Sequence, residues 1–192
     1  MIDRQDIINQ LRESSDVKNT MIIACVEDIE KAAEMMVAAA ENGRMIFWCG
    51  NGGSAADAQH MSAELMGGLR SHDRPAIKSI ALTTDSSFIT AWANDTDYES
   101  IFSRQIEGLG NEGDVLIAIS TSGNSKNVIK SIEACRDKGI SVIVLTGKSG
   151  GVLKELGDVT ISIPSDDTQR IQEGHLLTEH ILCEMVEKSV IG

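Results

Sequence analysis

The apolar residues of this chain change their spacing near residue 44. Over residues 3–43 they recur at intervals of three and four, which is typical of amphipathic helices, and the pattern stops near Asn42 and Gly43. From Met45 onward, short apolar runs alternate with stretches of helical spacing. The first part therefore predicts two leading helices, and the second predicts an α/β unit.

Five apolar runs in the second part are predicted to be strands, at residues 45–49, 77–82, 115–119, 141–145 and 159–163. The predicted helices that follow them are residues 54–69, 88–93, 100–109, 124–138, 152–156 and 168–189. Runs without polar alternation indicate burial on both faces, as in a parallel sheet covered by helices on each side.

The pattern predicts one domain over residues 1–192, with an α/β core and closing helix at 44–192. Such a sheet is not expected to cover both of the leading helices at 1–43 fully. We interpret them as a candidate oligomer surface, and the alternative is a plain internal layer of the same chain.

Residues 46–64 join the first predicted strand to a helix through a glycine turn. Glycines there allow positive φ and let a ligand approach the main chain, while Ser54 is expected to cap a helix whose free N–H groups attract anions. His60 and Glu64 are four residues apart, so they project from one face of that helix. The turn predicts phosphate binding next to a His/Glu pair.

Two further polar segments follow predicted strands. The loop from Ser120 to Ser125 contains several hydroxyls and one glycine before a helix, and it could hold a phosphate dianion without a lysine. The alternative is a well-capped turn. Asn94 and Asp95 could bind sugar hydroxyls, although Asn and Asp are also common turn residues.

The closing helix offers partners for the His/Glu pair. Gln172 and His180 are eight positions apart, about 80° around a helix axis, so both could address one site. Together with His60 and Glu64 they supply nitrogen and oxygen ligands for a divalent ion such as Zn²⁺. An HxxxE spacing is common by chance, however, and glutamine is an unusual metal ligand. His175 is expected to be structural.

Composition and charge narrow the function classes. A net charge of −12 and a pI near 4.7 argue against a nucleic-acid-binding surface. The four cysteines are scattered without a CxxC pair, which favours buried free thiols in a reducing cytoplasm. No apolar run approaches the roughly 20 residues of a membrane span, and the N-terminus lacks a signal-peptide pattern. We expect a cytoplasmic protein with no nucleic-acid or membrane partner.

Five motifs, taken in order, closely resemble the phosphoheptose isomerases, the sedoheptulose 7-phosphate isomerases of the sugar-isomerase (SIS) domain superfamily. They are CGNGGSAADAQH at 49–60, ALTTD at 81–85, ND at 94–95, ISTSGNS at 119–125 and RIQE at 170–173. The resemblance runs over nearly the whole chain. It implies a flavodoxin-like SIS fold and a homotetramer with active sites at subunit interfaces. It also implies conversion of D-sedoheptulose 7-phosphate to D-glycero-D-manno-heptose 7-phosphate, the first step toward the heptose of bacterial lipopolysaccharide and related glycans.

The resemblance also implies a role for each matching residue. One Zn²⁺ per subunit is expected at His60, Glu64, Gln172 and His180. The substrate is expected to contact Asn51, Gly52, Gly53, Ser54, Glu64, Asn94, Asp95, Ser120, Thr121, Ser122, Ser125 and Gln172. Glu64 is expected to act as the base at carbon and His180 as the acid/base partner at oxygen. This chain has Gly68 where many members carry an arginine, and Gln169 where some carry an aspartate.

Two other functions stay open. A related SIS tetramer without isomerase activity binds the bacterial replication initiator protein, but it lacks the acid and the histidine that correspond to Glu64 and His180. The other alternative is a sensor or isomerase of a different phosphosugar, because a serine loop recognises phosphate and not the length of a sugar chain.

Overall fold

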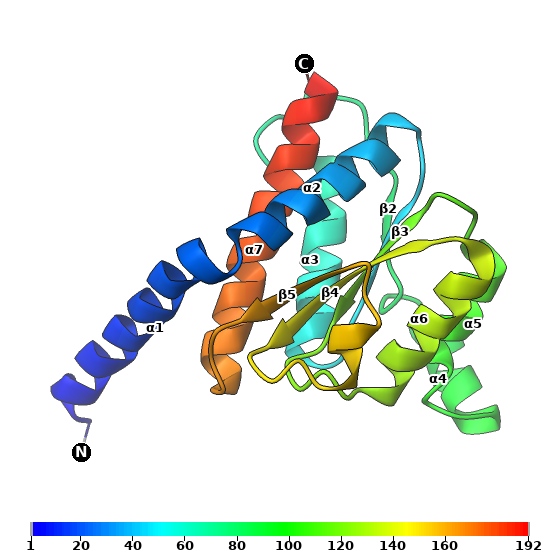
Figure 1. Ribbon diagram of the computed structural model, residues 1–192. Coiled ribbons are helices and arrows are strands. Elements are labelled where there is room, and N and C mark those ends of the chain that lie inside the picture. The colour runs from blue at the N-terminus through cyan, green and yellow to red at the C-terminus, as the bar shows by residue number, and fades with distance from the viewer. Residues whose placement is uncertain (1, 192) are drawn as a thin grey trace.

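The structure is a computed structural model that describes residues 2–191. Its helices are α1 (Arg4–Ala24), α2 (Val26–Glu41), α3 (Gly53–Gly67), α4 (Ser86–Asp95), α5 (Ile101–Leu109), α6 (Lys126–Lys138), the 3₁₀ helix η1 (Val152–Glu155) and α7 (Thr168–Ile191). Its strands are β1 (Ile46–Cys49), β2 (Ser79–Ala81), β3 (Val115–Ile119), β4 (Ser141–Gly147) and β5 (Val159–Ile163). The helices and strands alternate after α2, as predicted (Figure 1).

The five strands form one parallel sheet in the order β2-β1-β3-β4-β5. The chain starts this sheet at β1, adds β2 on one side and then crosses to β3 on the other side. In open α/β sheets, ligands bind beyond the carboxyl ends of the strands where the order reverses in this way. Cys49 pairs with Ala118, so the loops that follow β1 and β3 leave the sheet side by side. The predicted flavodoxin-like fold is confirmed.

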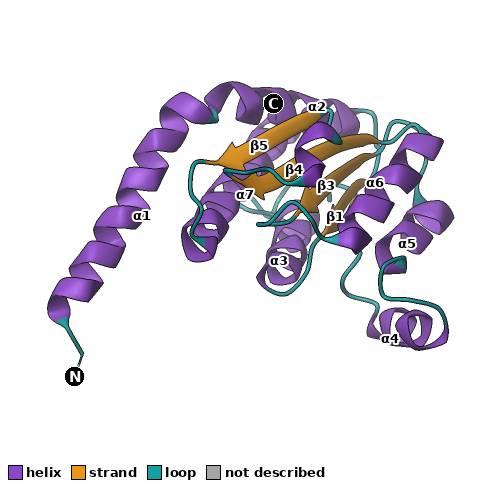
Figure 2. Ribbon diagram, turned by 60° about the horizontal axis from the view of Figure 1, so that its bottom comes forward, coloured by secondary structure: helices purple, strands orange, loops and turns teal. Residues whose placement is uncertain are grey.

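Alternating strand residues build a separate core on each face of the sheet. Trp48 and Ile117 pack with α2, α3 and α7, whereas Phe47 and Leu116 pack with α5 and α6. Figure 2 shows α5 and α6 across the sheet from α3 and α7. Continuous apolar strands therefore indicated burial on both faces correctly. All four cysteines are free and buried in these cores.

The leading helical pair is confirmed, but its two helices differ. They meet at Cys25, and α2 packs on the sheet with Met36 fully buried. α1 extends away from the domain, and its one buried residue in the described range is Met21 (Figures 1 and 2). Arg170 ties α1 to α7 by donating to the backbone oxygen of Gln10 at 2.6 Å. Leu11, by contrast, is 68% exposed.

Some predicted boundaries were wrong. β2 is limited to three residues, because the N–H of Ile77 at the predicted start of the strand donates to the oxygen of Leu65 in α3. α4 begins at Ser86, two residues early, because the Asp85 side chain accepts from Phe88 N at 2.9 Å and caps it. The segment predicted at 152–156 is the 3₁₀ helix η1. Across residues 2–191, no helix is both long and apolar enough to cross a membrane.

The cap predicted for the helix after β1 was also wrong. α3 starts at Gly53 with Gly52 as its N-cap, and no side chain caps it. Gly52 has φ of 56°, a conformation that glycine adopts without strain. Ser54 therefore lies inside the first turn of α3, where it is buried against Gly50.

Candidate active site

α3 and α7 run side by side in the same direction on one face of the sheet (Figure 1). Near their N-termini, a β-carbon at Gly53 would lie 3.0 Å from Nε2 of Gln172. Near their C-termini, Leu69 N donates to Oε1 of Glu187 at 2.9 Å. α3 therefore lies along α7 from the level of Gln172 to the level of Glu187.

Three predicted site residues meet in the middle of this helix pair. Nε2 of His60 and Oε1 of Glu64 are 3.0 Å apart. The rings of His60 and His180 meet edge to face with centroids 5.0 Å apart. His180 Nδ1 lies 2.9 Å from the carbonyl oxygen of Leu176, so Nδ1 carries the proton and Nε2 presents a lone pair. The cluster thus offers an imidazole nitrogen beside a carboxylate.

This cluster fits a zinc ion in part. Two imidazoles and a carboxylate are ligands that Zn²⁺ favours, and a ligating histidine usually donates its other N–H to a backbone carbonyl, as His180 does. Gln172, however, lies against Gly53, about 12 Å along the axis of α7 from His180 at 1.5 Å per residue. Within residues 2–191, no group of three or more His, Cys, Asp or Glu side chains is arranged so that it could hold a metal ion. Zinc binding stays a prediction.

Two acidic residues next to the cluster were missed from the sequence. Burial raises the pKa of Asp57, and the nearby imidazoles of His60 and His180 partly offset that effect. Glu179 is fully buried, and burial with the Asp57 charge raises its pKa to about 8. Asp57 shares a helix face with His60 and Glu64, a spacing that could have revealed it. Glu179 carries no such signal, because it faces the interior.

The turn after β1 is joined to the helix that the serine loop opens. Asn51 and Asn127 exchange two amide hydrogen bonds of 2.9 and 2.8 Å, and Tyr98 donates its hydroxyl to Asn51 Oδ1 at 3.0 Å. In the loop itself, the hydroxyls of Ser120 and Ser125 are 3.0 Å apart. The predicted sugar turn and the predicted phosphate loop therefore form one rim of the crevice at the reversal of strand order.

Two cavities adjoin this rim. One of about 370 Å³ lies between α3 and α7, where Gly53 and Asp57 face Gln172. The other, of about 210 Å³, is lined by Thr121 and Ser122 of the serine loop and by Lys148 after β4. Lys148 gives the predicted phosphate loop a neighbouring cation that was missed from the sequence.

Asn94 and Asp95 lie apart from the other predicted residues. They end α4, where the Asn94 amide donates to its neighbour Asp95 at 2.7 Å. Within the described part of the chain, no hydrogen bond or ion pair joins either of them to the His60 cluster or to the serine loop. Their predicted contact with the substrate stays a prediction.

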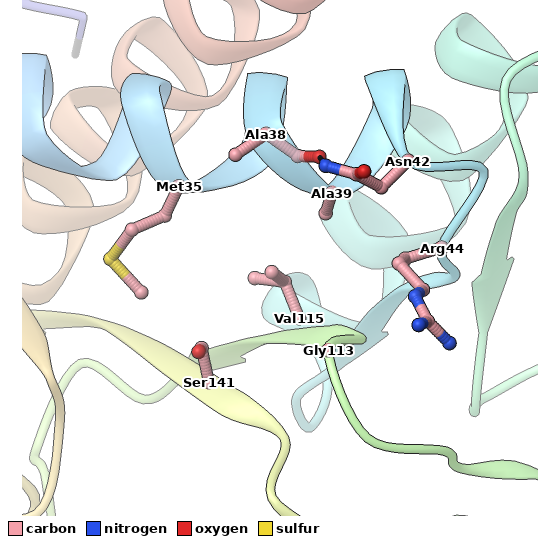
Figure 3. Close-up of a pocket in the computed structure, with 8 residues that line it drawn as sticks. All are labelled: Met35, Ala38, Ala39, Asn42, Arg44, Gly113, Val115 and Ser141. Atoms are coloured by element: carbon pink, nitrogen blue, oxygen red, sulfur yellow. Dashed lines mark hydrogen bonds between the residues drawn. The ribbon is translucent and has the colours of Figure 1, made fainter.

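A larger cavity, of about 430 Å³, lies at the amino ends of the strands, opposite the candidate site (Figure 3). Val115 and Ser141, the first residues of β3 and β4, line it with Arg44. Ligand sites of open α/β sheets lie at the carboxyl ends of the strands, and this cavity lies at the amino ends. We therefore exclude it from the candidate site.

The doubly wound sheet, with a serine loop at the reversal of strand order and a His/Glu cluster beside it, defines the class of sugar-isomerase domains. Residues 11–147 match the SIS domain family. The chain is 50% identical to the phosphoheptose isomerase of Shewanella denitrificans, over 99% of this chain and 97% of that protein.

Two solved structures agree with this result. Phosphoheptose isomerase from Neisseria gonorrhoeae superposes with a TM-score of 0.91 at 40% identity, covering 96% of this chain and 98% of that one. Phosphoheptose isomerase from Francisella tularensis gives 0.93 at 37% identity, covering 98% and 100%. This chain belongs to the phosphoheptose isomerases of the SIS domain family.

Proposed function

We propose that this protein interconverts D-sedoheptulose 7-phosphate and D-glycero-D-manno-heptose 7-phosphate. The observation that carries the proposal is the meeting of Glu64 and His180, one from α3 and one from α7, through His60. An aldose–ketose isomerase needs a base at carbon and a proton carrier between two oxygens, and this pair supplies both. The names of the relatives support the seven-carbon phosphosugar as substrate.

The proton movements follow from the chemistry of the two side chains. The Glu64 carboxylate takes a proton from C1 of the ketose and returns it to C2, so that an enediol lies between the two steps. Nε2 of His180 takes the proton of the O1 hydroxyl and delivers it to O2. The two transfers convert the C2 ketone to a C1 aldehyde with no net change in protons.

The serine loop and the turn after β1 bind and orient the substrate in this proposal. Ser120, Thr121, Ser122 and Ser125 hold the 7-phosphate, with Lys148 nearby. Asn51, Gly52 and Gly53 hold the sugar chain, while Asn94 and Asp95 bind its hydroxyls. A fixed phosphate sets the register of the chain, so that C1 and C2 reach Glu64.

One Zn²⁺ per subunit would be held by His60, Glu64 and His180, with Gln172 as a fourth ligand. When bound, the ion supplies Lewis-acid stabilisation of negative charge on the sugar oxygens. Because Nδ1 of His180 is bonded to Leu176, its Nε2 serves either as a ligand or as a proton carrier at any one moment. Glu64 has the same double role, and it is a stronger base when it is not ligating.

The separation of Gln172 from His180 supports a site that is shared between subunits of a homotetramer. If Gln172 completes the cluster of a neighbouring copy, no side chain has to span two turns of α7. Two surfaces could hold such copies together: the exposed side of α1 with Leu11, and an apolar cavity of about 590 Å³ between α2 and α7. The buried free cysteines support a reducing cytoplasm as its location.

The decisive experiment is an assay of purified Glu64→Gln and His180→Gln with sedoheptulose 7-phosphate, following aldoheptose 7-phosphate. Both variants are expected to lose at least a hundredfold in kcat, because general acid–base groups contribute about that much. Glu133→Gln, on the exposed surface of α6, is the matched control and should retain wild-type kcat.

Near-normal turnover by either variant would remove that residue from the mechanism. Conversion of a hexose or hexosamine phosphate in preference to sedoheptulose 7-phosphate would contradict the substrate. We propose that the product enters the synthesis of lipopolysaccharide heptose. A strain whose only copy of the protein is Glu64→Gln is then expected to lack that heptose.

A further inference from the structure

A second pair of charged residues, outside the acid–base cluster, joins α7 to the loop that follows α3. Arg74 Nε donates to Oε1 of Glu187 at 2.7 Å, and both side chains are only 2% exposed. Glu187 also accepts from the backbone N–H groups of Leu69 and Arg70 at 2.9 and 2.7 Å. The Glu187 carboxylate on α7 thus binds the first two residues of the loop, Leu69 and Arg70, as well as Arg74.

Arg74 carries this connection to Glu64 itself. Its Nη2 donates to the backbone oxygen of Glu64 at 2.8 Å, and its Nη1 donates to the backbone oxygen of Pro75 at 2.9 Å. The Glu64 oxygen also accepts from Gly68 N at 2.9 Å, the bond that ends α3. The guanidinium is therefore bonded at once to α7, to the loop and to the residue proposed as base.

The partners of the Glu187 carboxylate favour its charged form. Burial by itself would raise the pKa of Glu187, but the bonds from Arg74 and from the backbone N–H groups lower it to about 2. A charged acceptor with all its partners in place gives strong, directional bonds.

Gly68 gives this loop its shape. Its φ is 127°, and a β-carbon there would collide with the backbone oxygen of Ser71 and lie 2.7 Å from His72 Nδ1. Any larger residue would push the loop away from Glu187. The loop instead directs Arg70 back to α7, where its guanidinium lies 3.1 Å from Oε2 of Glu184. The path of this loop therefore requires glycine at position 68.

We propose that Arg74 and Glu187 are positioning residues that fix the Glu64 carboxylate relative to His180. The pair locks the last turn of α3 to α7, the helix that carries His180, and so holds the proposed base against its proton-carrying partner. Buried ion pairs contribute little net stability compared with apolar side chains of the same volume. A role in positioning accounts for an arginine whose guanidinium donates to Glu187, to Pro75 and to Glu64. The inference rests on the proposed isomerase function.

The sharpest variant is Arg74→Lys. Lysine can keep the ion pair with Glu187, but a single ammonium cannot also reproduce the forked bonds to Glu64 and Pro75. We expect kcat to fall 10- to 100-fold, because a displacement of about 1 Å at a reacting group costs that much, while KM changes less than twofold. Glu187→Gln keeps the shape of the side chain. It is likewise expected to lower kcat while KM changes little.

Ser79→Ala is the control for a merely structural effect. It removes the acceptor of the buried Trp48 indole N–H, bonded at 3.0 Å, and so destabilises the same side of the sheet without touching Arg74 or Glu187. It should lower the melting temperature and leave kcat per folded molecule unchanged. The inference is overturned if Arg74→Lys and Glu187→Gln lose kcat only in proportion to their unfolded fraction, measured by circular dichroism.

Hydrogen exchange separates this inference from the proposed function. In Arg74→Lys, the amide of Gly68, which is bonded to Glu64, should exchange at least tenfold faster, while the amides of β3 keep the wild-type rate. If the wild-type protein does not convert sedoheptulose 7-phosphate, the proposed function fails and exchange alone decides whether the pair fixes Glu64. Unchanged exchange at Gly68 overturns the inference whatever the activity.

Discussion

The imidazoles of His60 and His180 meet edge to face, with their planes at 78° and their centroids 5.0 Å apart. His60 also contacts Glu64 one turn further along α3. The three side chains come from two helices that run side by side, so the cluster depends on the packing of α3 against α7.

The first prediction concerns the open nitrogen of His180. Because Nδ1 donates to the Leu176 oxygen, added Zn²⁺ should shift the Nε2 resonance of His180 and leave its Nδ1 proton in place. The measurement is a long-range ¹H–¹⁵N correlation spectrum of histidine-labelled protein before and after zinc addition. His175, buried and bonded to the Thr146 oxygen, serves as the internal reference. Loss of the His180 Nδ1 proton would show that the metal binds the other nitrogen.

The second prediction tests whether a site is shared between copies. Gln172→Ala and His180→Ala proteins should each be inactive when pure. After unfolding and refolding together, about a quarter of the sites in a randomly mixed tetramer combine an intact Gln172 with an intact His180 from another copy, so about a quarter of wild-type activity should return. If both residues act within one chain, the mixture stays inactive.

The third prediction concerns the glycine in the serine loop. Gly123 has φ of 65°, and a β-carbon there would collide with the backbone oxygen of Gly150. Gly123→Ala should displace the loop and remove at least one bond to the phosphate, worth ~1.5 kcal/mol or more, so that KM rises about tenfold.

Gly43→Ala is the matched control for that change. Gly43 has nearly the same φ, 63°, but nothing lies within 4 Å of a β-carbon there. Its substitution should cost about 1 kcal/mol of stability through backbone strain alone and leave KM unchanged. An equal rise in KM for both variants would mean that strain, and not displacement of the loop, weakens binding.

The fourth prediction is a pH dependence of stability. Burial lowers the pKa of His175 to about 4 from an ordinary value of 6.5, against a smaller opposing effect of its bond to Thr146. Between these values the unfolded chain binds a proton that the folded chain refuses, so the stability from neutral His175 is complete above pH 6.5 and declines as the pH falls toward 4.

His175→Gln keeps a donor for the Thr146 oxygen but cannot bind that proton. Urea unfolding at pH 7 and at pH 4.5 should therefore show a smaller loss of stability in His175→Gln than in the wild type. His72→Gln, in the exposed loop after α3, should keep the wild-type pH dependence. Identical losses in wild type and His175→Gln would contradict a buried neutral histidine.

The fold could be predicted from the sequence because buried parallel strands read as continuous apolar runs. β3 and β4 were located within two residues for that reason. β2 was drawn too long at its start, since Ile77 is buried but donates its N–H to the oxygen of Leu65 in α3 and not to the sheet. The start of α4 was misplaced because a cap by Asp85 depends on local backbone geometry that the apolar pattern does not encode.

The site could be predicted only in part. His60 and Glu64 share one helix, so their contact follows from spacing alone. Asp57 and Glu179 approach each other only because α3 packs against α7, and no spacing within one helix carries that information. Arg74 lies in an irregular loop, where its three bonding partners are set by the folded path of the chain.

α7 supplies His180 to one cluster and Glu187 to the other. Both clusters also need residues from the first half of the chain, so their contacts span most of its length. Such long-range contacts form late in folding. All five strands and the glycine turn precede α7 in the chain, yet without α7 there is neither an acid–base pair nor a partner for Arg74 beside Glu64. A single helix is thus common to the proposed chemistry and to the contacts that hold it in place.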